Sequence, residues 1–310
     1  FLFCARAFAV ELPALHADIS PVTVSGLSSG GYMAVQFHVA HSAMVRGAGV
    51  IAAGPYYCAM GSVWTAYYNC MSPGWWTPLP AAAALKGVTE ALARDKRIDP
   101  IGNLSLARVW LFSGTQDHTV SPTVVRELWA YYALFGVKPV MVADKPAGHA
   151  MVTENAGNKE CGATRDPYIN DCDYDAAGEL LKHLLGALKP PAKEGPLREF
   201  NQAGGAGMAG KGFVYVPKVC EKERCRVHVA FHGCRQSAGE VGDRFAREAG
   251  YNRWAESNAL IVLYPQVKSG WLNPRACWDW WGYTGSAYHT KDGAQIRAVR
   301  AMLEQLSAKK

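Results

Sequence analysis

The stretch VTVSGLSSGGYMAVQF at residues 22–37 decides the fold. Its β-branched start predicts a buried strand, and a helical pattern begins at Gly31. Between them, residues 26–30 spell G-x-S-x-G, and a strand, a glycine-flanked turn and a helix together are the context of a nucleophile elbow. The glycines let the backbone turn tightly enough to hold the Ser28 hydroxyl above the sheet edge. We therefore predict that Ser28 is a nucleophile; the alternative is a Gly/Ser-rich turn without catalytic meaning.

A nucleophilic serine needs two partners: an imidazole that takes its proton and a carboxylate that orients the imidazole. In α/β-hydrolases both lie on loops at strand ends, in the order Ser, acid, His. Asp117 follows the strand-like run ARVWLFSG at 107–114, and His149 lies in the loop after the next run, VKPVMVA at 137–143. The sequence therefore predicts Asp117 as the acid and His149 as the general base.

Other interpretations of these two residues stay open. His118 and Asp144 stand close to the same strand ends and compete for the two roles. Asp117 would have a purely structural role if it only capped the helix that begins near Ser121, and His149 would be incidental if it were an ordinary loop histidine. Most other histidines fall within predicted helices or strands, where a base at the sheet edge is not expected.

An acyl-transfer site also needs hydrogen-bond donors for the developing oxyanion. In an elbow, one donor is the backbone N–H of Ser29, the residue after the nucleophile. The second usually follows a strand in an HG-type motif, and His232-Gly233-Cys234 ends the strand-like run at 225–233, with a plain β-turn as the alternative. The motif order is inverted, because the HG loop usually precedes the nucleophile and here follows it by some 200 residues.

Strands alternate with helices along most of the chain, which predicts an α/β-hydrolase fold with a mostly parallel central sheet flanked by helices. A circular permutation explains the inverted motif order, with the Pro- and Gly-rich stretch 189–212 as the joint of the permuted halves. Neither half holds a complete site, so we expect one domain over residues 10–310. The other strand-like runs are 47–54, 212–217 and 259–265, and the helical patterns are 31–44, 122–135, 174–188 and 292–308.

The first ten residues, FLFCARAFAV, are mostly apolar and contain Ala7-Phe8-Ala9, which matches the small-x-small pattern of a signal cleavage site. We interpret residues 1–9 as the remnant of a secretory signal peptide; an ordinary buried segment is the alternative. Cleavage after Ala9 removes Cys4 and leaves eight cysteines, an even number.

These eight cysteines fall into pairs. Three pairs are close in sequence and suit short disulfide loops, and the remaining two cysteines would close one long loop. A metal site is the rival interpretation, but no CxxC occurs and no His stands at zinc-finger spacing, which favours disulfides and an oxidising compartment. The predicted bridges are Cys58–Cys70, Cys161–Cys172, Cys220–Cys225 and Cys234–Cys277.

The composition excludes several classes of protein. Of the 310 residues, 49% are hydrophobic, which provides a large core and excludes intrinsic disorder. The net charge of +6 is diffuse, so we expect no nucleic-acid partner. No run approaches the roughly 20 apolar residues of a membrane-spanning helix. We expect a secreted protein, extracellular or periplasmic, that is monomeric, needs no metal or cofactor and does not bind membranes.

Six sequence blocks together resemble a known family. The blocks are GLSSGGYMAVQ at 26–36, SGTQDHTV at 113–120, GHAMVT at 148–153, VAFHGCRQS at 229–237, GYNRWAESNALIVLYPQ at 250–266 and CWDWWGY at 277–283. With them the chain is similar to extracellular poly(3-hydroxybutyrate) depolymerases of the single-domain, circularly permuted type, from about residue 21 to residue 306. The resemblance implies a triad of Ser28, Asp117 and His149 and an oxyanion hole made by the N–H groups of Ser29 and Cys234.

By the same resemblance, the aromatic block Trp278 to Trp281 would line a polymer-binding crevice, with Trp278 and Trp281 as substrate-binding residues. Trp75 and Trp76 are further candidates, and for all of these rings the alternative is core packing. Strand alternation along CWDWWGY would place Trp278 and Trp280 on one face and Trp281 on the other.

Two rival functions remain. The HGC, YPQ and CW blocks are also similar to those of feruloyl and acetylxylan esterases, which act on plant polysaccharide esters. A catalytically inactive surface-binding protein is the second rival. The resemblance favours ester hydrolysis in a short-chain polyhydroxyalkanoate.

Overall fold

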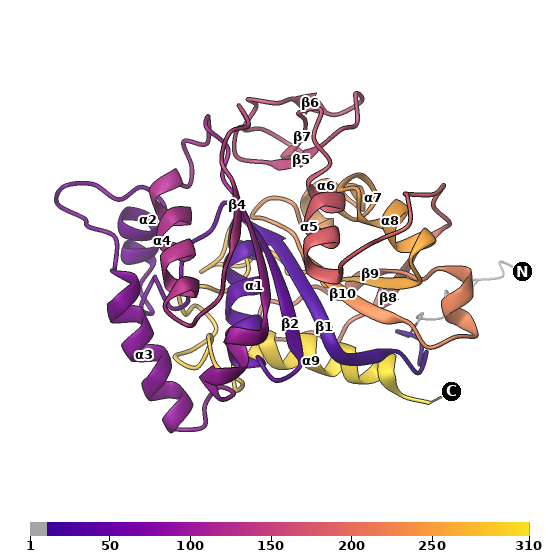
Figure 1. The fold of residues 1–310 in the computed structure, drawn as a ribbon, viewed down its shortest axis with the longest axis horizontal. Coiled ribbons are helices and arrows are strands. Elements are labelled where there is room, and N and C mark those ends of the chain that lie inside the picture. The colour runs from indigo at the N-terminus through magenta and orange to yellow at the C-terminus, as the bar shows by residue number, and fades with distance from the viewer. Residues whose placement is uncertain (1–10, 310) are drawn as a thin grey trace, which may run out of the picture.

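The computed structural model describes residues 11–309 and contains an eight-stranded central sheet (Figure 1). The expected signal remnant at residues 1–9 and Cys4 lie outside the described residues. The strand order is β4-β3-β2-β1-β10-β11-β9-β8. The strands are β1 (Asp18–Leu27), β2 (Val45–Ile51), β3 (Arg108–Phe112), β4 (Val140–Val142), β8 (Leu197–Asn201), β9 (Lys211–Tyr215), β10 (Arg226–Phe231) and β11 (Leu260–Tyr264).

Six strands of this sheet, from β4 to β11, pair parallel, and β9 alone runs in the opposite direction, pairing antiparallel with both β11 and β8. The predicted mostly parallel α/β sheet is confirmed. In the register of the sheet, Gly26 of β1 lies opposite Phe231 of β10 and Val50 of β2. The carboxyl ends of these strands therefore meet at one edge, where the loops that carry the predicted site residues begin.

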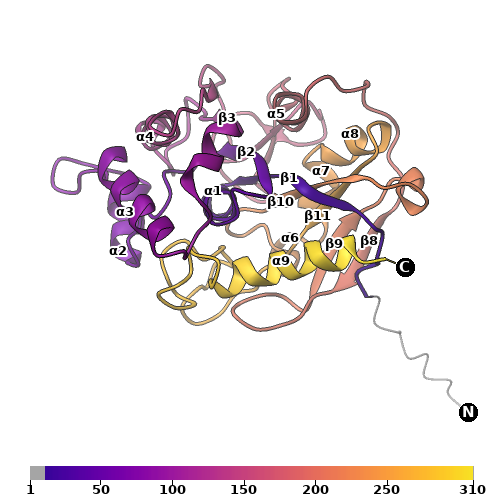
Figure 2. The ribbon, with the colours of Figure 1, turned by 60° about the horizontal axis from the view of Figure 1, so that its bottom comes forward.

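Helices cover both faces of the sheet because the strand side chains alternate between two cores. Val24 of β1 packs in one core with residues of α1 and α9, and Val262 of β11 packs in the other with residues of α5 and α8. Figure 2 shows α9 below the sheet and α8 above it. The helices are α1 (Ser29–Ala40), α2 (Val63–Cys70), α3 (Ala82–Arg94), α4 (Pro122–Ala133), α5 (Ala176–Leu185), α6 (Ala238–Val241), α7 (Arg244–Glu248), α8 (Tyr251–Ser257) and α9 (Ala294–Ser307), with 3₁₀ turns at η1 (Ile101–Leu106) and η2 (Lys218–Glu221).

The structure adds elements that the sequence patterns did not predict. Helices α2 and α3 occupy a region without a predicted element, and strand β8 lies inside the stretch 189–212 that was interpreted only as a joint. Helix α2 escaped notice because it is eight residues long and its aromatic side chains are exposed. A three-stranded sheet follows His149 and consists of β5 (Met151–Thr153), β7 (Ile169–Asp171) and β6 (Lys159–Glu160).

The two ends of the described chain lie side by side. The N–H groups of Leu15 and Ala17 donate to the carbonyl of Leu306 at 3.1 and 2.9 Å, and the N–H of His16 donates to that of Ala308 at 3.0 Å. Helix α9 thus ends beside the segment that leads into β1. Adjacent ends are what a circular permutation requires, and we keep the permutation, with its joint in 189–212, as a proposal.

Four disulfides hold the loops, and their pairing is the one predicted from cysteine spacing. They join Cys58 to Cys70, Cys161 to Cys172, Cys220 to Cys225 and Cys234 to Cys277. Between residues 11 and 309, every helix is too short or too polar to cross a bilayer.

Candidate active site

Ser28 stands at the turn between β1 and α1 in a conformation that serine rarely adopts. Its φ is 56°, in the left-handed region, and its N–H donates to the carbonyl of Ile51 at 2.9 Å. The turn needs glycine on both sides. A Cβ on Gly26 would lie 2.2 Å from the carbonyl oxygen of Gly30, and one on Gly30 would lie 2.4 Å from that of His232. This strained turn presents the Ser28 side chain at the sheet edge, as a nucleophile elbow does.

Asp117 and His149 contact each other directly. The distance from Oδ2 of Asp117 to Nδ1 of His149 is 2.8 Å. The other carboxylate oxygen, Oδ1, accepts hydrogen bonds from the N–H groups of Thr119 and Val120 at 2.8 and 2.9 Å. Both side chains are buried. A carboxylate at Nδ1 favours the tautomer that leaves Nε2 free to accept a proton, which is the arrangement that a general base requires.

The competing residues lie elsewhere. The His118 side chain is exposed, and Asp144 is an exposed carboxylate that pairs with Lys145 at 3.5 Å. Ser121, and not Asp117, caps α4, because its hydroxyl accepts the N–H of Thr123. The structure therefore brings Asp117 to His149 and excludes the purely structural alternative in which Asp117 caps α4.

An open cavity of about 450 Å³ is lined by several of the residues that were predicted to act on the substrate. Ser28, His149 and Cys234 all line it, and a volume of this size suits a small organic ligand. The rest of the wall is mainly apolar and comes largely from α2 and from the loops after β10 and β11, with Thr164 and Tyr168 from the segment that precedes β7. It includes Leu27, Val63, Ala66, Met71, Leu272, Pro274, Trp280 and Trp281.

The peptide between Gly233 and Cys234 has a defined orientation. Its carbonyl accepts a hydrogen bond from Nδ1 of His232 at 2.7 Å, while Nε2 of His232 accepts the N–H of Val267 at 3.3 Å. Burial lowers the pKa of His232 to about 4, so this imidazole is neutral at neutral pH. Because a trans peptide directs its N–H opposite to its carbonyl, the Cys234 N–H faces away from His232.

Two N–H groups are therefore suited to an oxyanion. Ser29 is the first residue of α1, and the N–H groups of a helix's first turn have no acceptor within the helix. In the part of the chain that the structure describes, the Cys234 N–H donates to no other backbone or side-chain group. The pair carries the partial positive charge of a helix N-terminus and of a fixed peptide dipole.

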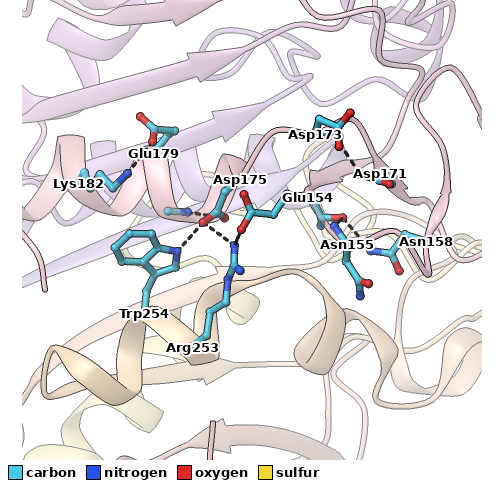
Figure 3. A network of polar contacts seen from close by, with 12 residues as sticks. Glu154, Asn155, Asn158, Asp171, Asp173, Asp175, Glu179, Lys182, Arg253 and Trp254 are labelled. Carbon is cyan, nitrogen blue, oxygen red and sulfur yellow. Dashed lines mark hydrogen bonds and ion pairs between the residues drawn. The ribbon is translucent and has the colours of Figure 1, made fainter. Parts of the chain in front are cut away.

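A polar network anchors the segment that carries His149 (Figure 3). The segment continues through β5 to Glu154, whose carboxylate accepts a hydrogen bond from Arg253 of α8 at 2.6 Å. The same guanidinium nitrogen lies 2.7 Å from Asp175, which caps α5 and also accepts the indole N–H of Trp254 at 2.6 Å. A long loop is thus tied to two helices of the sheet's outer layer.

The aromatic block differs from its predicted geometry. Trp278 is fully buried, packs edge-on against Phe231 with 4.9 Å between the ring centroids, and does not line the cavity. The expectation that Trp278 contacts substrate is therefore corrected: it is a core residue. Trp280 and Trp281 both line the cavity, and Trp280 stacks on Tyr32 with 3.9 Å between the centroids.

The reason is that residues 277–283 form a loop and not a strand. The buried carboxylate of Asp279 accepts the N–H groups of Gly282 at 2.7 Å, Tyr283 at 3.0 Å and Thr284 at 2.8 Å. Wrapping the chain around one carboxylate breaks the two-residue alternation, so Trp280 and Trp281 share the cavity wall.

Four exposed tryptophans stand close in sequence to residues that line this cavity. Trp75 and Trp76 are 87% and 89% exposed, Trp271 is 95% exposed and Trp64, on α2, is 69% exposed. We call these four residues the aromatic rim. Each lies within a few residues of a side chain that lines the cavity. Trp75 and Trp76 were candidates from the sequence, whereas Trp64 and Trp271 were not.

Two similar turns hold most of the rim in solvent. Gly74 and Thr77 exchange backbone hydrogen bonds at 3.2 Å each way, with the two adjacent tryptophans at the tip. Gly270 and Asn273 do the same at 3.0 Å, with Trp271 and a leucine at the tip. A two-residue turn closed from both sides gives its tip side chains no core to pack into.

Sequence reasoning also missed Arg235 and Arg275, which line the cavity. A signal was present: Arg235 follows Cys234 and Arg275 precedes Cys277 by two residues, so the predicted disulfide already brings the two arginines together.

Comparisons with known proteins agree on one family. The model of the family described as esterase PHB depolymerase matches residues 212–309. The chain is 44% identical over 313 residues to a poly(3-hydroxybutyrate) depolymerase of Delftia acidovorans, covering 97% of this chain and 62% of that protein. It is 35% identical over 329 residues to a polyhydroxybutyrate depolymerase of Talaromyces funiculosus, covering 98% and 95%. The chain thus spans less than two thirds of the Delftia protein and nearly all of the Talaromyces protein.

Solved structures give the same result. The crystal structure of a PHB depolymerase from Penicillium funiculosum matches with a TM-score of 0.88 at 33% identity, covering 96% of this chain and 98% of that one. A serine-to-alanine variant of a PHB depolymerase complexed with an R3HB trimer matches equally well, with a TM-score of 0.88.

Proposed function

The chain belongs to the polyhydroxybutyrate depolymerase family, and from that premise we propose that it is a serine esterase that hydrolyses poly(3-hydroxybutyrate), related short-chain polyhydroxyalkanoates and their oligomers. One observation carries the proposal: the elbow serine lines the same cavity as His149, whose Nδ1 lies 2.8 Å from the carboxylate of Asp117. The family resemblance alone would not distinguish an active enzyme from an inactive binding protein, whereas this geometry supports catalysis.

The residues suit a two-step acyl transfer. Nε2 of His149 takes the proton of Ser28 as Oγ attacks the ester carbonyl, and Asp117 stabilises the imidazolium that forms. The N–H groups of Ser29 and Cys234 receive the negative oxygen of the tetrahedral intermediate. The proton then passes to the leaving alcohol, and an acyl-enzyme remains on Ser28. Water, deprotonated by His149, releases the acid and restores the serine.

The rim supports a polymeric and water-insoluble substrate. A polyester surface offers apolar groups and ester oxygens but no charges along its chain, so adsorption must come mainly from apolar area removed from water. Tryptophan offers more of this area than any other side chain, and the four tryptophans of the rim are exposed in segments that also contribute residues to the cavity wall. A soluble feruloyl or acetyl ester would not require such a surface.

The disulfides and the origin of the site residues bear on the cellular location and the oligomeric state of the protein. Four disulfides support an oxidising compartment, so we place the protein outside the cell or in a periplasm. Ser28, Asp117 and His149 come from one chain, so a monomer would already hold the complete site, and sedimentation analysis tests this.

The test is clearing of a poly(3-hydroxybutyrate) suspension with mass spectrometry of the products, using acetylated xylan and a feruloyl ester as comparison substrates. We expect clearing by the native chain and none by Ser28→Ala, with labelling by an active-site phosphonate only in the native chain. Turnover of the polysaccharide esters without clearing would overturn the polyester proposal in favour of the rival esterase.

A further inference from the structure

The cavity wall carries an unbalanced positive charge. Arg235 and Arg275 both line it and both are exposed, whereas no Asp or Glu occurs among the described residues of the wall. In the described part of the chain, neither guanidinium takes part in an ion pair. Two unpaired guanidinium groups in a wall that is otherwise mainly apolar favour an anionic ligand.

The two arginines are held together by their backbones. The N–H of Arg235 donates to the carbonyl of Arg275 at 2.7 Å, and the disulfide between Cys234 and Cys277 joins the same two loops. Arg235 directly follows Cys234, whose N–H is a proposed oxyanion donor. An anion held by the arginines would therefore lie close to the reacting carbonyl, in the same cavity as Ser28.

Arg235 is also held in an unusual conformation. Its φ is 60°, a region that favours glycine, and its side chain donates to the hydroxyl of Tyr168, another residue of the cavity wall, at 3.4 Å. Arg235 therefore combines a long charged side chain with a strained left-handed conformation in the wall of the cavity that Ser28 also lines, and such strain concentrates at functional sites.

We propose that Arg235 and Arg275 form a subsite for the terminal carboxylate of a hydroxyalkanoate oligomer. This inference rests on the proposed function, because a polyester of 3-hydroxy acids has one free carboxylate, at one end of each chain. When Ser28 takes the acyl part, the ester C–O bond breaks and the alcohol product keeps that carboxylate. The subsite therefore binds the leaving half and directs cleavage to bonds near the carboxyl end.

The test compares two substrates that differ only in charge: a linear 3-hydroxybutyrate trimer with a free carboxylate, and the methyl ester of the same trimer. The measured quantity is the ratio of their kcat/KM values. The variants are Arg235→Gln, Arg275→Gln and the double variant. Arg297→Gln is the control, because Arg297 is exposed on α9 and lies outside the cavity wall. This substitution removes the same single positive charge as each of the two single variants.

We expect the acid-to-ester ratio to fall about fivefold in each single variant and more than about tenfold in the double variant, as for the loss of a partly solvated charged hydrogen bond. Arg297→Gln should leave the ratio unchanged. Added salt should lower the ratio of the native chain, because screening weakens an exposed ion pair. A ratio that does not change in the double variant, or that falls equally in Arg297→Gln, would overturn the subsite.

Binding measurements separate this inference from the proposed function. Calorimetry with Ser28→Ala, which keeps both arginines, should show tighter binding of the trimer acid than of its methyl ester, and the preference should vanish in Ser28→Ala/Arg235→Gln/Arg275→Gln. A native chain that binds the acid preferentially but hydrolyses neither trimer would overturn the function and keep the subsite. Equal binding of acid and ester would overturn the subsite, whatever the activity.

Discussion

We call Ser28, Asp117 and His149 the floor of the site, and the floor and the aromatic rim differ in how far their side chains are exposed to water. On the floor, Ser28, Asp117 and His149 are only 8%, 4% and 7% exposed, and hydrogen bonds hold the acid and the base in place. On the rim, Trp75 and Trp271 are 87% and 95% exposed and contact mainly water. Bond cleavage needs atoms held to a fraction of an ångström, whereas adsorption to a flat polymer needs area and little orientation.

The difference predicts separable energies. A whole Trp side chain exposes about 200 Å², and a ring laid flat on a polymer covers about half of that area, which contributes roughly 2.5 kcal/mol at about 25 cal/mol per Å². Losing one rim residue should therefore weaken adsorption moderately. Losing one floor residue should abolish turnover. The predictions below are arranged from the largest effect to the smallest.

The largest effect is expected at Ser28. Ser28→Ala removes the proposed nucleophile, and His149→Ala removes the proposed base, so each should lower turnover of a soluble butyrate ester by about 10⁴-fold or more. Circular dichroism and thermal melting should show a folded protein in both cases. Near-normal turnover in a folded Ser28→Ala protein would refute the assignment of the floor.

Replacing Asp117, the proposed acid, should lower kcat somewhat less than replacing Ser28 or His149. Asp117→Asn keeps the shape but weakens control of the imidazole tautomer, so we expect a loss of about a hundred- to ten-thousandfold in kcat. His118→Ala is the matched control, because His118 is exposed and adjacent in sequence, and it should stay within about twofold. Equal damage from His118→Ala would mean that the base has been misassigned.

The disulfide beside the oxyanion donor links floor and wall. Replacing Cys234 and Cys277 with serine frees the loop that orients the Cys234 N–H, and we expect about a tenfold loss of kcat on the soluble ester, less than for complete removal of a donor. The matched control is the same change at Cys220 and Cys225, a bridge that lies outside the cavity wall. Equal activity in the two proteins would show that the bridge does not support the site.

The strand that leads to Ser28 also depends on a neutral imidazole, that of His228. His228 bonds Ser25 on the nucleophile strand at 2.8 Å, and burial lowers the pKa of His228 to about 3. The unfolded chain takes up this proton below the ordinary pKa of 6.5, so stability should fall as pH drops from there toward 3, by up to about 1.4 kcal/mol per pH unit. Denaturant unfolding across this range should show a shallower slope for His228→Gln. An unchanged slope would exclude His228 as a cause.

Sequence reasoning succeeded where chemistry constrains local spacing. The elbow, the order of acid and base and the pairing of close cysteines each depend on a short motif, so the sequence predicted one site from Ser28, Asp117 and His149, and the structure places Asp117 at 2.8 Å from His149 and Ser28 in the same cavity as His149. Trp278 was misplaced for two reasons. The carboxylate of Asp279 wraps its own loop and breaks strand alternation, and Trp278 is buried by packing against Phe231, which is distant in sequence.

The rim was predictable only in part. Trp75 and Trp76 stand in a Pro- and Gly-rich loop, which suggested exposure. Trp271 follows Gly270 in a turn whose tip can be located only from its reciprocal hydrogen bonds, and no periodic pattern marks it. Arg235 and Arg275 become neighbours through tertiary structure, so their shared place in the cavity could have come only from the predicted disulfide.

The separation of floor from rim is tested most directly by adsorption to a poly(3-hydroxybutyrate) film, measured with a quartz crystal microbalance alongside turnover of a soluble butyrate ester. Two proteins are compared with the native chain: Ser28→Ala and Trp75→Ala/Trp76→Ala/Trp271→Ala. We predict that Ser28→Ala adsorbs like the native chain without turnover, whereas the triple variant adsorbs at least about tenfold more weakly and keeps most of its ester turnover. Parallel loss of adsorption and turnover in either protein, or full adsorption by the triple variant, would contradict the account.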